Sequence, residues 1–295
     1  MFRHLSTVAW VILAALGSLA LTIAMPSCGN QADSTKPDTA TQEAGAGSKT
    51  EGPPKQIAVD LGRGVKLEMV RIPAGEFMMG SPSADKDARD EEKPQHRVRI
   101  TKPYYLGTYL VTQEQWQAVM GNNPSHFTGP NSPVEEVSWD DCQQFLGKLN
   151  AKSRPGGGKF QLPSEAQWEY ACRAGSKTAY SFGDDESGLG EYSWYMANAN
   201  DKSQPVGQKK PNAFGLYDVH GNVGEWCQDW YGDGYYANST ADDPSGPTTG
   251  LTRVNRGGGW DRPARYCRSA FRSYYVPGFR LDFVGFRVAQ VLADN

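Results

Sequence analysis

The chain of 295 residues carries a formal net charge of −3, so the basic surface typical of nucleic-acid-binding proteins is not expected. Hydrophobic residues make up 38% of the chain and charged residues 21%, which lies within the range of globular proteins. With 33 Gly, 19 Pro, 8 Trp and 14 Tyr, the composition favours a loop-rich domain with large aromatic anchors over a helical bundle.

Residues 1–28 have the pattern of an export signal. Arg3 and His4 precede an apolar run over residues 8–25, and Ser27-Cys28 ends that run. A cysteine at this break predicts a bacterial lipoprotein signal, with Cys28 as the lipidated first residue of the mature chain. The run is also long enough for an uncleaved membrane anchor, which is the alternative. We expect an exported protein held at a membrane of the bacterial cell envelope.

Residues 29–56 are rich in Ser, Thr, Ala, Gly, Pro and Lys and contain almost no large apolar side chains. Such a segment cannot bury enough surface to fold, so it is predicted to be a disordered tether. The folded domain is then expected over residues 57–295.

Four cysteines remain in the exported part of the chain, and their even number favours disulfides in an oxidising compartment. The alternative is four buried free thiols. The sequence has no CxxC pair and no Cys/His cluster, so a zinc site is not expected. The scattered histidines give no metal triad and no obvious Cys–His nucleophile pair. The cysteines are Cys142, Cys172, Cys227 and Cys267.

Local patterns predict a mixed domain. Alternating residues predict strand over 65–77, with a turn at Pro73-Ala74-Gly75, and over 96–100. Short strands are expected again over 253–256 and 286–291. Ser or Thr caps, two of them within capping boxes, predict three helices between these strands. The helical signal disappears over 176–250. The predicted helices span residues 112–121, 138–152 and 164–175.

The stretch from Gly215 to Trp230 combines apolar anchors with oxygen-bearing side chains. Gly221-Asn222 is a turn signal, because both residues tolerate positive φ. Asp218 and Glu225 flank that turn, so a tight turn would bring two carboxylates and backbone carbonyls together. Hard cations such as Ca²⁺ prefer that all-oxygen environment. The alternative is a surface turn between two core strands with unrelated carboxylates.

Six motifs occur in a fixed order along the chain. They are Phe77-Met78-Met79-Gly80, Val137-Ser138-Trp139-Asp140-Asp141, Leu162-Pro163-Ser164-Glu165-Ala166-Gln167-Trp168-Glu169-Tyr170, Gly221-Asn222-Val223-Gly224-Glu225-Trp226, Arg256-Gly257-Gly258-Gly259-Trp260 and Gly285-Phe286-Arg287-Val288. The local patterns alone indicate an irregular α+β domain. Together the six motifs resemble the formylglycine-generating enzyme / sulfatase-modifying factor family over about residues 65–291. The resemblance implies a C-type-lectin-like fold, loop-rich with few helices and short strands.

The family's oxidase chemistry needs a C-x4-C pair that binds copper and uses oxygen to convert a sulfatase cysteine to formylglycine. Counting from Gly259, the first family cysteine falls on Arg262 and the second on Cys267. Counting back from Gly285, a three-residue deletion places Cys267 near a structural disulfide cysteine of the family. The pair is broken in both alignments, because an arginine has no lone pair to donate to copper.

The resemblance also implies a Ca²⁺ site and a disulfide. The Ca²⁺ ligands would be the side chains of Asp218 and Glu225 and the carbonyl groups of Gly221 and Val223. A weaker second site would involve Asn198 and Ala199, in a segment that is shorter here than in the family. The implied disulfide joins Cys172 to Cys267.

These features predict a non-catalytic envelope module with a binding, structural or accessory role. The alternative is a divergent oxidase in which Cys267 is catalytic and copper is the cofactor. The related iron sulfoxide synthases need a further helical domain and three His ligands, which this sequence lacks. The partner is expected to be an envelope protein, peptide or glycan. Six aromatic residues could line a groove for a peptide or glycan, or serve as core anchors. They are Trp194, Tyr195, Trp230, Tyr231, Tyr235 and Tyr236.

Overall fold

The computed structural model of the chain describes residues 54–152 and 158–292. The predicted signal over 1–28, including Cys28, and nearly all of the predicted tether over 29–56 lie outside the described residues. The first strand, β1 (Gln56–Gly62), begins at the last residue of the predicted tether. Within the described ranges, no helix has the length and apolar character needed to cross a membrane.

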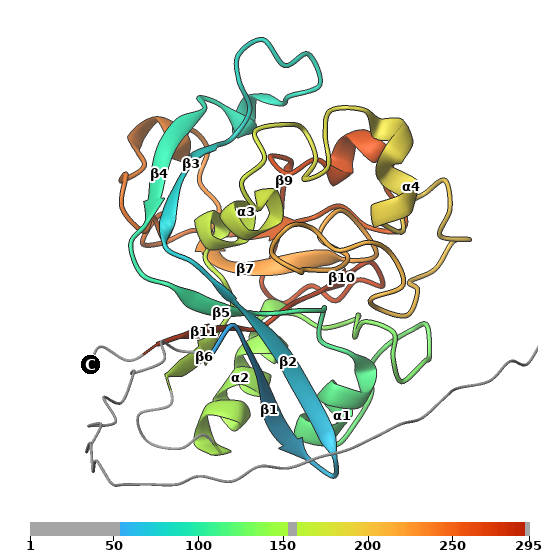
Figure 1. Cartoon of the computed structure of the whole chain (residues 1–295). Helices are drawn as coiled ribbons and strands as arrows, with labels where there is room; N and C mark the ends of the chain where they lie inside the picture. Colours follow the sequence, from blue (N-terminus) through green and yellow to red (C-terminus); the bar gives the residue numbers. More distant parts are fainter. Residues whose placement is uncertain (1–53, 153–157, 293–295) are drawn as a thin grey trace, which may run out of the picture. The chain divides into compact units, whose positions relative to one another are not determined.

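A five-stranded sheet with the order β1-β2-β5-β11-β6 forms one half of the domain (Figure 1). Every pair of neighbouring strands in this sheet is antiparallel. The turn between β1 and β2 contains Gly62, Arg63 and Gly64, which all have positive φ. The strand predicted over 65–77 separates into two strands at Pro73-Ala74, where the Pro-Ala-Gly turn is predicted. Besides β1, the five-stranded sheet contains β2 (Val65–Ile72), β5 (Tyr104–Gly107), β6 (Lys159–Gln161) and β11 (Ala289–Val291).

The second part of the divided strand is β3 (Gly75–Met79), which pairs with β4 (His96–Ile100) in a separate two-stranded sheet. A four-stranded sheet has the order β10-β7-β8-β9. Its inner strand β7 lies in the region 176–250, where the helical signal disappears and no strand bounds were predicted. The first four residues of β7 are all buried, so it lacks the alternation that marks a half-exposed strand. The strands are β7 (Gly224–Trp230), β8 (Arg253–Arg256), β9 (Arg272–Tyr275) and β10 (Val284–Gly285).

The three predicted helices are confirmed as α1 (Gln113–Met120), α2 (Trp139–Lys152) and α3 (Glu165–Arg173). Both predicted capping boxes are present: Thr112 with Gln115, and Ser164 with Gln167. Helix α3 ends at Arg173, two residues before the predicted end at Gly175, because Ala174 already adopts the left-handed conformation at φ 47°. A short further helix, α4, covers Leu189–Tyr192.

Two hydrophobic clusters hold these elements together. In the first, α1 packs on β1 and β2, and the ring of Trp116 stacks on Phe145 of α2 with 5.4 Å between centroids. In the second, α3 packs against β3, β4, β7 and β8. Figure 1 shows α3 directly above β7, with the five-stranded sheet below. The predicted α+β, loop-rich architecture is therefore confirmed, and α3 is the helix that faces the four-stranded sheet.

Candidate functional site

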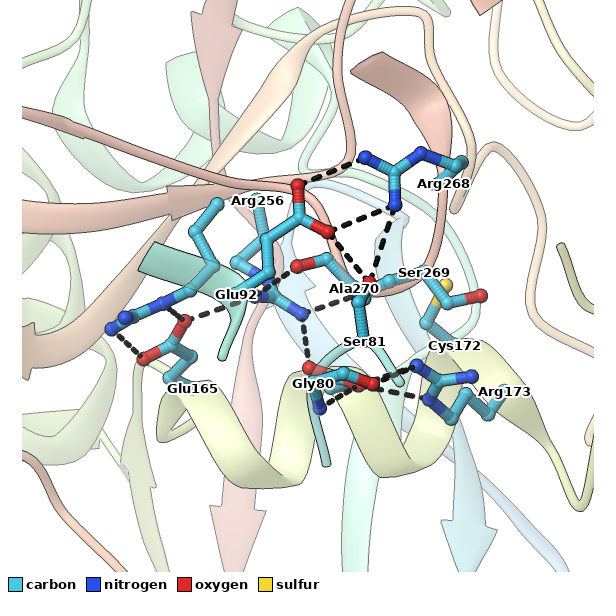
Figure 2. Close-up of polar contacts among 12 residues, drawn as sticks. Gly80, Ser81, Glu92, Glu165, Cys172, Arg173, Arg256, Arg268, Ser269 and Ala270 are labelled. Carbon is cyan, nitrogen blue, oxygen red and sulfur yellow. Dashed lines mark hydrogen bonds and ion pairs between the residues drawn. The ribbon is translucent and has the colours of Figure 1, made fainter. Parts of the chain in front are cut away.

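Buried charges join α3 to the paired strands β8 and β9 (Figure 2). Glu165 and Glu169 lie one turn apart on the same side of α3. Arg256 of β8 donates from Nη1 to Glu165 at 2.9 Å and from Nη2 to Glu169. Arg272 of β9 donates to both oxygens of Glu165, at 2.6 and 2.7 Å. We call these four residues the arginine–glutamate network.

The network continues toward the loop before β4. Arg173 donates to Glu169 at 2.8 Å and to the carbonyl of Gly80 at 3.1 Å. Arg268 pairs with both oxygens of Glu92, at 2.8 and 2.9 Å. Two of the family motifs thus meet through side chains that the sequence interpretation did not single out. The sequence signal that could have found them is the pair Glu165 and Glu169, two carboxylates at positions i and i+4 on the buried face of α3.

The opposite face of β8 and β9 carries a small pocket. Asn255 pairs with Ser273 across the two strands, and both residues point away from the network because side chains alternate along a strand. A pocket of about 150 Å³ lies over them. Its aromatic walls include Tyr266 and Phe271, with ring centroids 4.9 Å apart, and Tyr275 is also part of its lining. We call this the Arg262 pocket, after the guanidinium at its edge.

The segment predicted to carry the broken cysteine pair forms the edge of this pocket. Gly258 has φ +78°, and a Cβ there would lie 2.7 Å from the sulfur of Cys267, so only glycine fits. Arg262 is partly exposed, with Nε 3.2 Å from Asp261 and Nη2 3.3 Å from the hydroxyl of Tyr275. Cys267 is fully buried in the last turn of a 3-10 helix over Ala264–Cys267. Burial raises the pKa of Cys267 to about 12.

Cys172 and Cys267 both contact His220, although their sulfurs are not bonded. The sulfur of Cys172 lies 3.9 Å from Nδ1 of His220, and that nitrogen lies 2.8 Å from the carbonyl oxygen of Cys267. Ser181 donates its backbone N–H to Nε2 of the same ring at 3.0 Å, so Nδ1 carries the proton. The four cysteines of the folded domain are buried free thiols in the structure. The Cys172–Cys267 disulfide is not formed there and stays a prediction.

This His220 contact does not make a nucleophile. Burial raises the pKa of the Cys172 thiol to about 12 and lowers the pKa of His220 to about 4. The protonated Nδ1 faces a carbonyl oxygen and cannot accept a proton from the thiol. The cysteine is therefore a packed thiol beside a neutral imidazole.

The residues predicted to hold Ca²⁺ come together only in part. Asp218 and Asn222 are both left-handed, at φ 59° and 67°, so the chain turns tightly where predicted. Oδ2 of Asp218 accepts from the backbone N–H of Gly207 at 2.8 Å, whereas the buried Oδ1 has no partner among the described residues. Burial raises the pKa of Asp218 to about 6. An unpartnered buried carboxylate oxygen fits a hard cation.

Glu225 fits that role less well. Both of its carboxylate oxygens accept from Arg287, at 2.7 and 2.9 Å, and both side chains are fully buried. Val223 is fully buried, and a Cβ on Gly221 would lie 2.3 Å from the carbonyl oxygen of Trp194. The turn is therefore locked against a neighbouring loop, and Glu225 already has a cationic partner.

The second predicted set has partners within the protein. Oδ1 of Asn198 accepts from the backbone N–H of Tyr195 at 2.8 Å. The carbonyl of Ala199 accepts from Nε2 of Gln204 at 2.7 Å. Over residues 54–152 and 158–292, no group of three or more His, Cys, Asp or Glu is placed to hold a metal ion. Both predicted Ca²⁺ sites thus stay predictions, with Asp218 as the better-supported ligand.

The aromatic residues considered for a groove lie in different parts of the domain. Tyr236 is buried and donates its hydroxyl to Glu165 at 3.1 Å. The guanidinium carbon of Arg253 lies 3.4 Å from the ring centroid of Trp230, and Nζ of Lys209 lies 3.9 Å from the ring centroid of Trp194. These contacts favour packing anchors over one shared groove.

Comparison with known proteins agrees with this architecture. The sequence matches the family described as "Sulfatase-modifying factor enzyme 1-like domain" over residues 61–292. It is 32% identical to the formylglycine-generating enzyme of Streptomyces coelicolor, covering 75% of this chain and 88% of that protein. It is 30% identical to the chaperone protein LppX of Paenibacillus barcinonensis, covering 53% of this chain and 69% of the relative.

A solved structure shares the fold. The structure of Treponema denticola variable protein 1 superposes with a TM-score of 0.72 at 33% sequence identity, covering 81% of this chain and 99% of that one. With few helices and short, curled sheets, the predicted C-type-lectin-like fold is confirmed. The chain therefore belongs to the formylglycine-generating enzyme / sulfatase-modifying factor family.

Proposed function

We propose that this protein is a non-oxidase member of its family, with a binding or accessory role at the bacterial cell envelope. The observation that carries the proposal is the donor set at the family's copper position. Counted from Gly259, Arg262 stands at one cysteine position, and counted back from Gly285 the pair is broken as well; the remaining Cys267 is fully buried with its pKa raised to about 12. A copper-binding thiolate needs a lowered pKa and a second sulfur, so these residues do not fit copper.

The same segment offers a pocket in place of a reactive thiol. The Arg262 pocket opens where Arg262 and Tyr275 meet, and the buried sulfur of Cys267 is not part of its lining. A guanidinium with aromatic walls is suited to binding and has no redox chemistry of its own. One of the relatives is named a chaperone protein, which supports an accessory role.

The proposed location rests on the N-terminal sequence pattern. Cys28 would be lipidated and residues 29–56 would hold the domain away from the membrane. Metabolic labelling with a fatty acid should mark the wild type and not Cys28→Ala, which should be released from the membrane. Membrane association of Cys28→Ala with an intact N-terminus would instead identify an uncleaved anchor.

The oxidase alternative is tested with purified protein, Cu(I), oxygen and a sulfatase-derived CxPxR peptide. We expect no aldehyde above the level given by Cys267→Ser, because the only sulfur in the segment is buried and protonated. Aldehyde formation that requires both copper and Cys267 would contradict the proposal and identify a one-cysteine oxidase.

Calcium is part of the proposal, with Asp218 as its principal ligand. If Ca²⁺ binds at the turn, chelation with EDTA should lower the melting temperature, because a ligand that binds only the folded state stabilises it. Asp218→Asn should remove that response, since it deletes the charge that faces the site. Identical melting curves with and without EDTA, together with no Ca²⁺ in the purified protein, would rule this site out.

A further inference from the structure

We propose that the Arg262 pocket binds a carboxylate group attached to a small apolar body. This inference rests on the proposed binding role and names the ligand class for the same segment of the chain. Three features of the pocket carry it: a buried donor without a partner, an incompletely paired guanidinium, and aromatic walls.

The buried donor is the side-chain amide of Asn255. This residue is only 4% exposed, yet its Nδ2 has no hydrogen-bond partner within the described part of the chain. It lines the pocket from β8, where cross-strand pairing with Ser273 fixes its backbone. A buried amide without a hydrogen-bond partner destabilises the free protein, so an acceptor that enters the pocket relieves this cost.

The guanidinium of Arg262 supplies the charge. Its Nε contacts Asp261 at 3.2 Å and its Nη2 contacts the hydroxyl of Tyr275 at 3.3 Å, so Nη1 is left without a partner among the described residues. Arg89 also lines the pocket and has its Nε 2.9 Å from Glu91. No carboxylate lines the pocket itself, because Asp261 and Glu91 lie outside the lining.

Further positive charge lies at the rim. Arg265 contacts the hydroxyl of Tyr266, which lines the pocket, at 3.4 Å. That hydrogen bond, with the charges of Arg265, Arg89 and Arg262, lowers the pKa of Tyr266. The surroundings therefore favour an anion over a neutral or cationic ligand.

The shape of the donor set selects among anions. One guanidinium and one amide provide the few convergent donors that a planar, two-oxygen carboxylate needs. The rings of Phe271 and Phe283 line the same pocket, and the guanidinium groups of Arg89 and Arg262 lie 5.9 and 5.0 Å from their respective centroids. A phosphate has more oxygens than the guanidinium of Arg262 and one amide can pair, so some would be left against the rings. Those rings suit an apolar body, and a cavity of about 150 Å³ can hold one of benzene size.

Titration of the whole chain with benzoate tests the proposal. We expect benzoate to shift the NMR signal of the Asn255 side-chain amide, and benzamide to bind at least tenfold more weakly. Arg262→Gln should weaken benzoate binding at least tenfold, and Asn255→Asp should abolish it. The matched control is Arg280→Gln, an exposed arginine paired with Asp141 outside the pocket, which should bind as the wild type does.

Two peptides that end in phenylalanine, one with a free C-terminal carboxylate and one with a C-terminal amide, test whether the bound carboxylate belongs to a peptide terminus or to a small molecule. Binding of the free-acid peptide but not its amide would assign the pocket to a chain terminus, whereas binding of benzoate alone would assign it to a small molecule. Equal binding of benzoate and benzamide, or no effect of benzoate on Asn255, would overturn the proposal. Equal losses in Arg262→Gln and Arg280→Gln would overturn it too. The copper assay measures aldehyde without any carboxylate probe, so failure of the non-oxidase proposal is seen separately.

Discussion

On one face of strands β8 and β9, Arg256 and Arg272 are buried and paired with Glu165, while over the other face Arg262 is partly exposed and incompletely paired. The difference comes from the element that covers each face. Helix α3 supplies two carboxylates to the network face, whereas a loop containing Gly258 covers the pocket face and leaves space. The same residue type therefore fixes the fold on one side and remains available for a ligand on the other.

The largest expected effect comes from breaking the network face. Arg256→Met should lower the free energy of unfolding by about 3–5 kcal/mol, because it leaves buried carboxylates short of a charge partner. Arg280→Met, which breaks the exposed pair with Asp141, should cost about 1 kcal/mol or less. Urea denaturation of both variants measures the difference. Similar losses in the two would show that the buried network contributes no more than a surface ion pair.

The next effect is a pH dependence that arises beside the network. Asp229 is buried and its Oδ2 accepts from the backbone N–H of Glu165 at 2.9 Å. Burial, together with the charge of Glu165, raises the pKa of Asp229 to about 8, far above its value of about 3.9 in an unfolded chain. The folded state thus holds a proton that the unfolded state releases.

Because the pKa of Asp229 is higher in the folded state than in the unfolded state, its contribution to stability is present at low pH and is lost as the pH rises toward 8. Relative to Asp229→Asn, the free energy of unfolding should fall as the pH rises from about 4 to 8, by at most about 1.4 kcal/mol for one pH unit, which is less than the expected cost of Arg256→Met. Urea denaturation across this range compares the two proteins. Parallel pH profiles would mean that Asp229 ionises normally in the fold.

The smallest effect on stability is expected on the pocket face. Arg262→Gln should change the free energy of unfolding by about 0.5 kcal/mol or less, because the side chain is partly exposed and its pair with Asp261 is weak. Its effect on benzoate binding should be large. A loss of stability comparable to that of Arg256→Met would show that Arg262 is a structural residue and remove the contrast between the faces.

Local sequence signals predicted the helices well, because their caps lie within four residues. Thr112 and Gln115, like Ser164 and Gln167, form reciprocal hydrogen bonds that need no distant partner. Strand β7 was missed for the opposite reason. Its side chains are buried by residues from elsewhere in the chain, so no local alternation marks it.

The candidate site was predicted in part. The sequence located the segment around Arg262 and Cys267 and the turn at Asp218, because ordered motifs and turn residues mark them. It did not show that Glu225 is paired with Arg287, 62 residues away. It also left open whether six aromatic residues line one groove or serve as core anchors, and their contacts in separate clusters favour anchors.

The sequence by itself determined the family and the three capped helices, since each depends on residue identity or on contacts within one turn. Only the tertiary structure decided which charges are satisfied. Arg256, Arg262 and Arg272 lie within 17 residues of one another, yet α3 reaches two of them and not the third. Arg256 and Arg272 are cross-strand partners on the face of β8 and β9 that α3 covers, whereas Arg262 lies in the segment between the two strands. Pairing between distant parts of the chain sets that difference, because neighbouring residues of two paired strands face the same element.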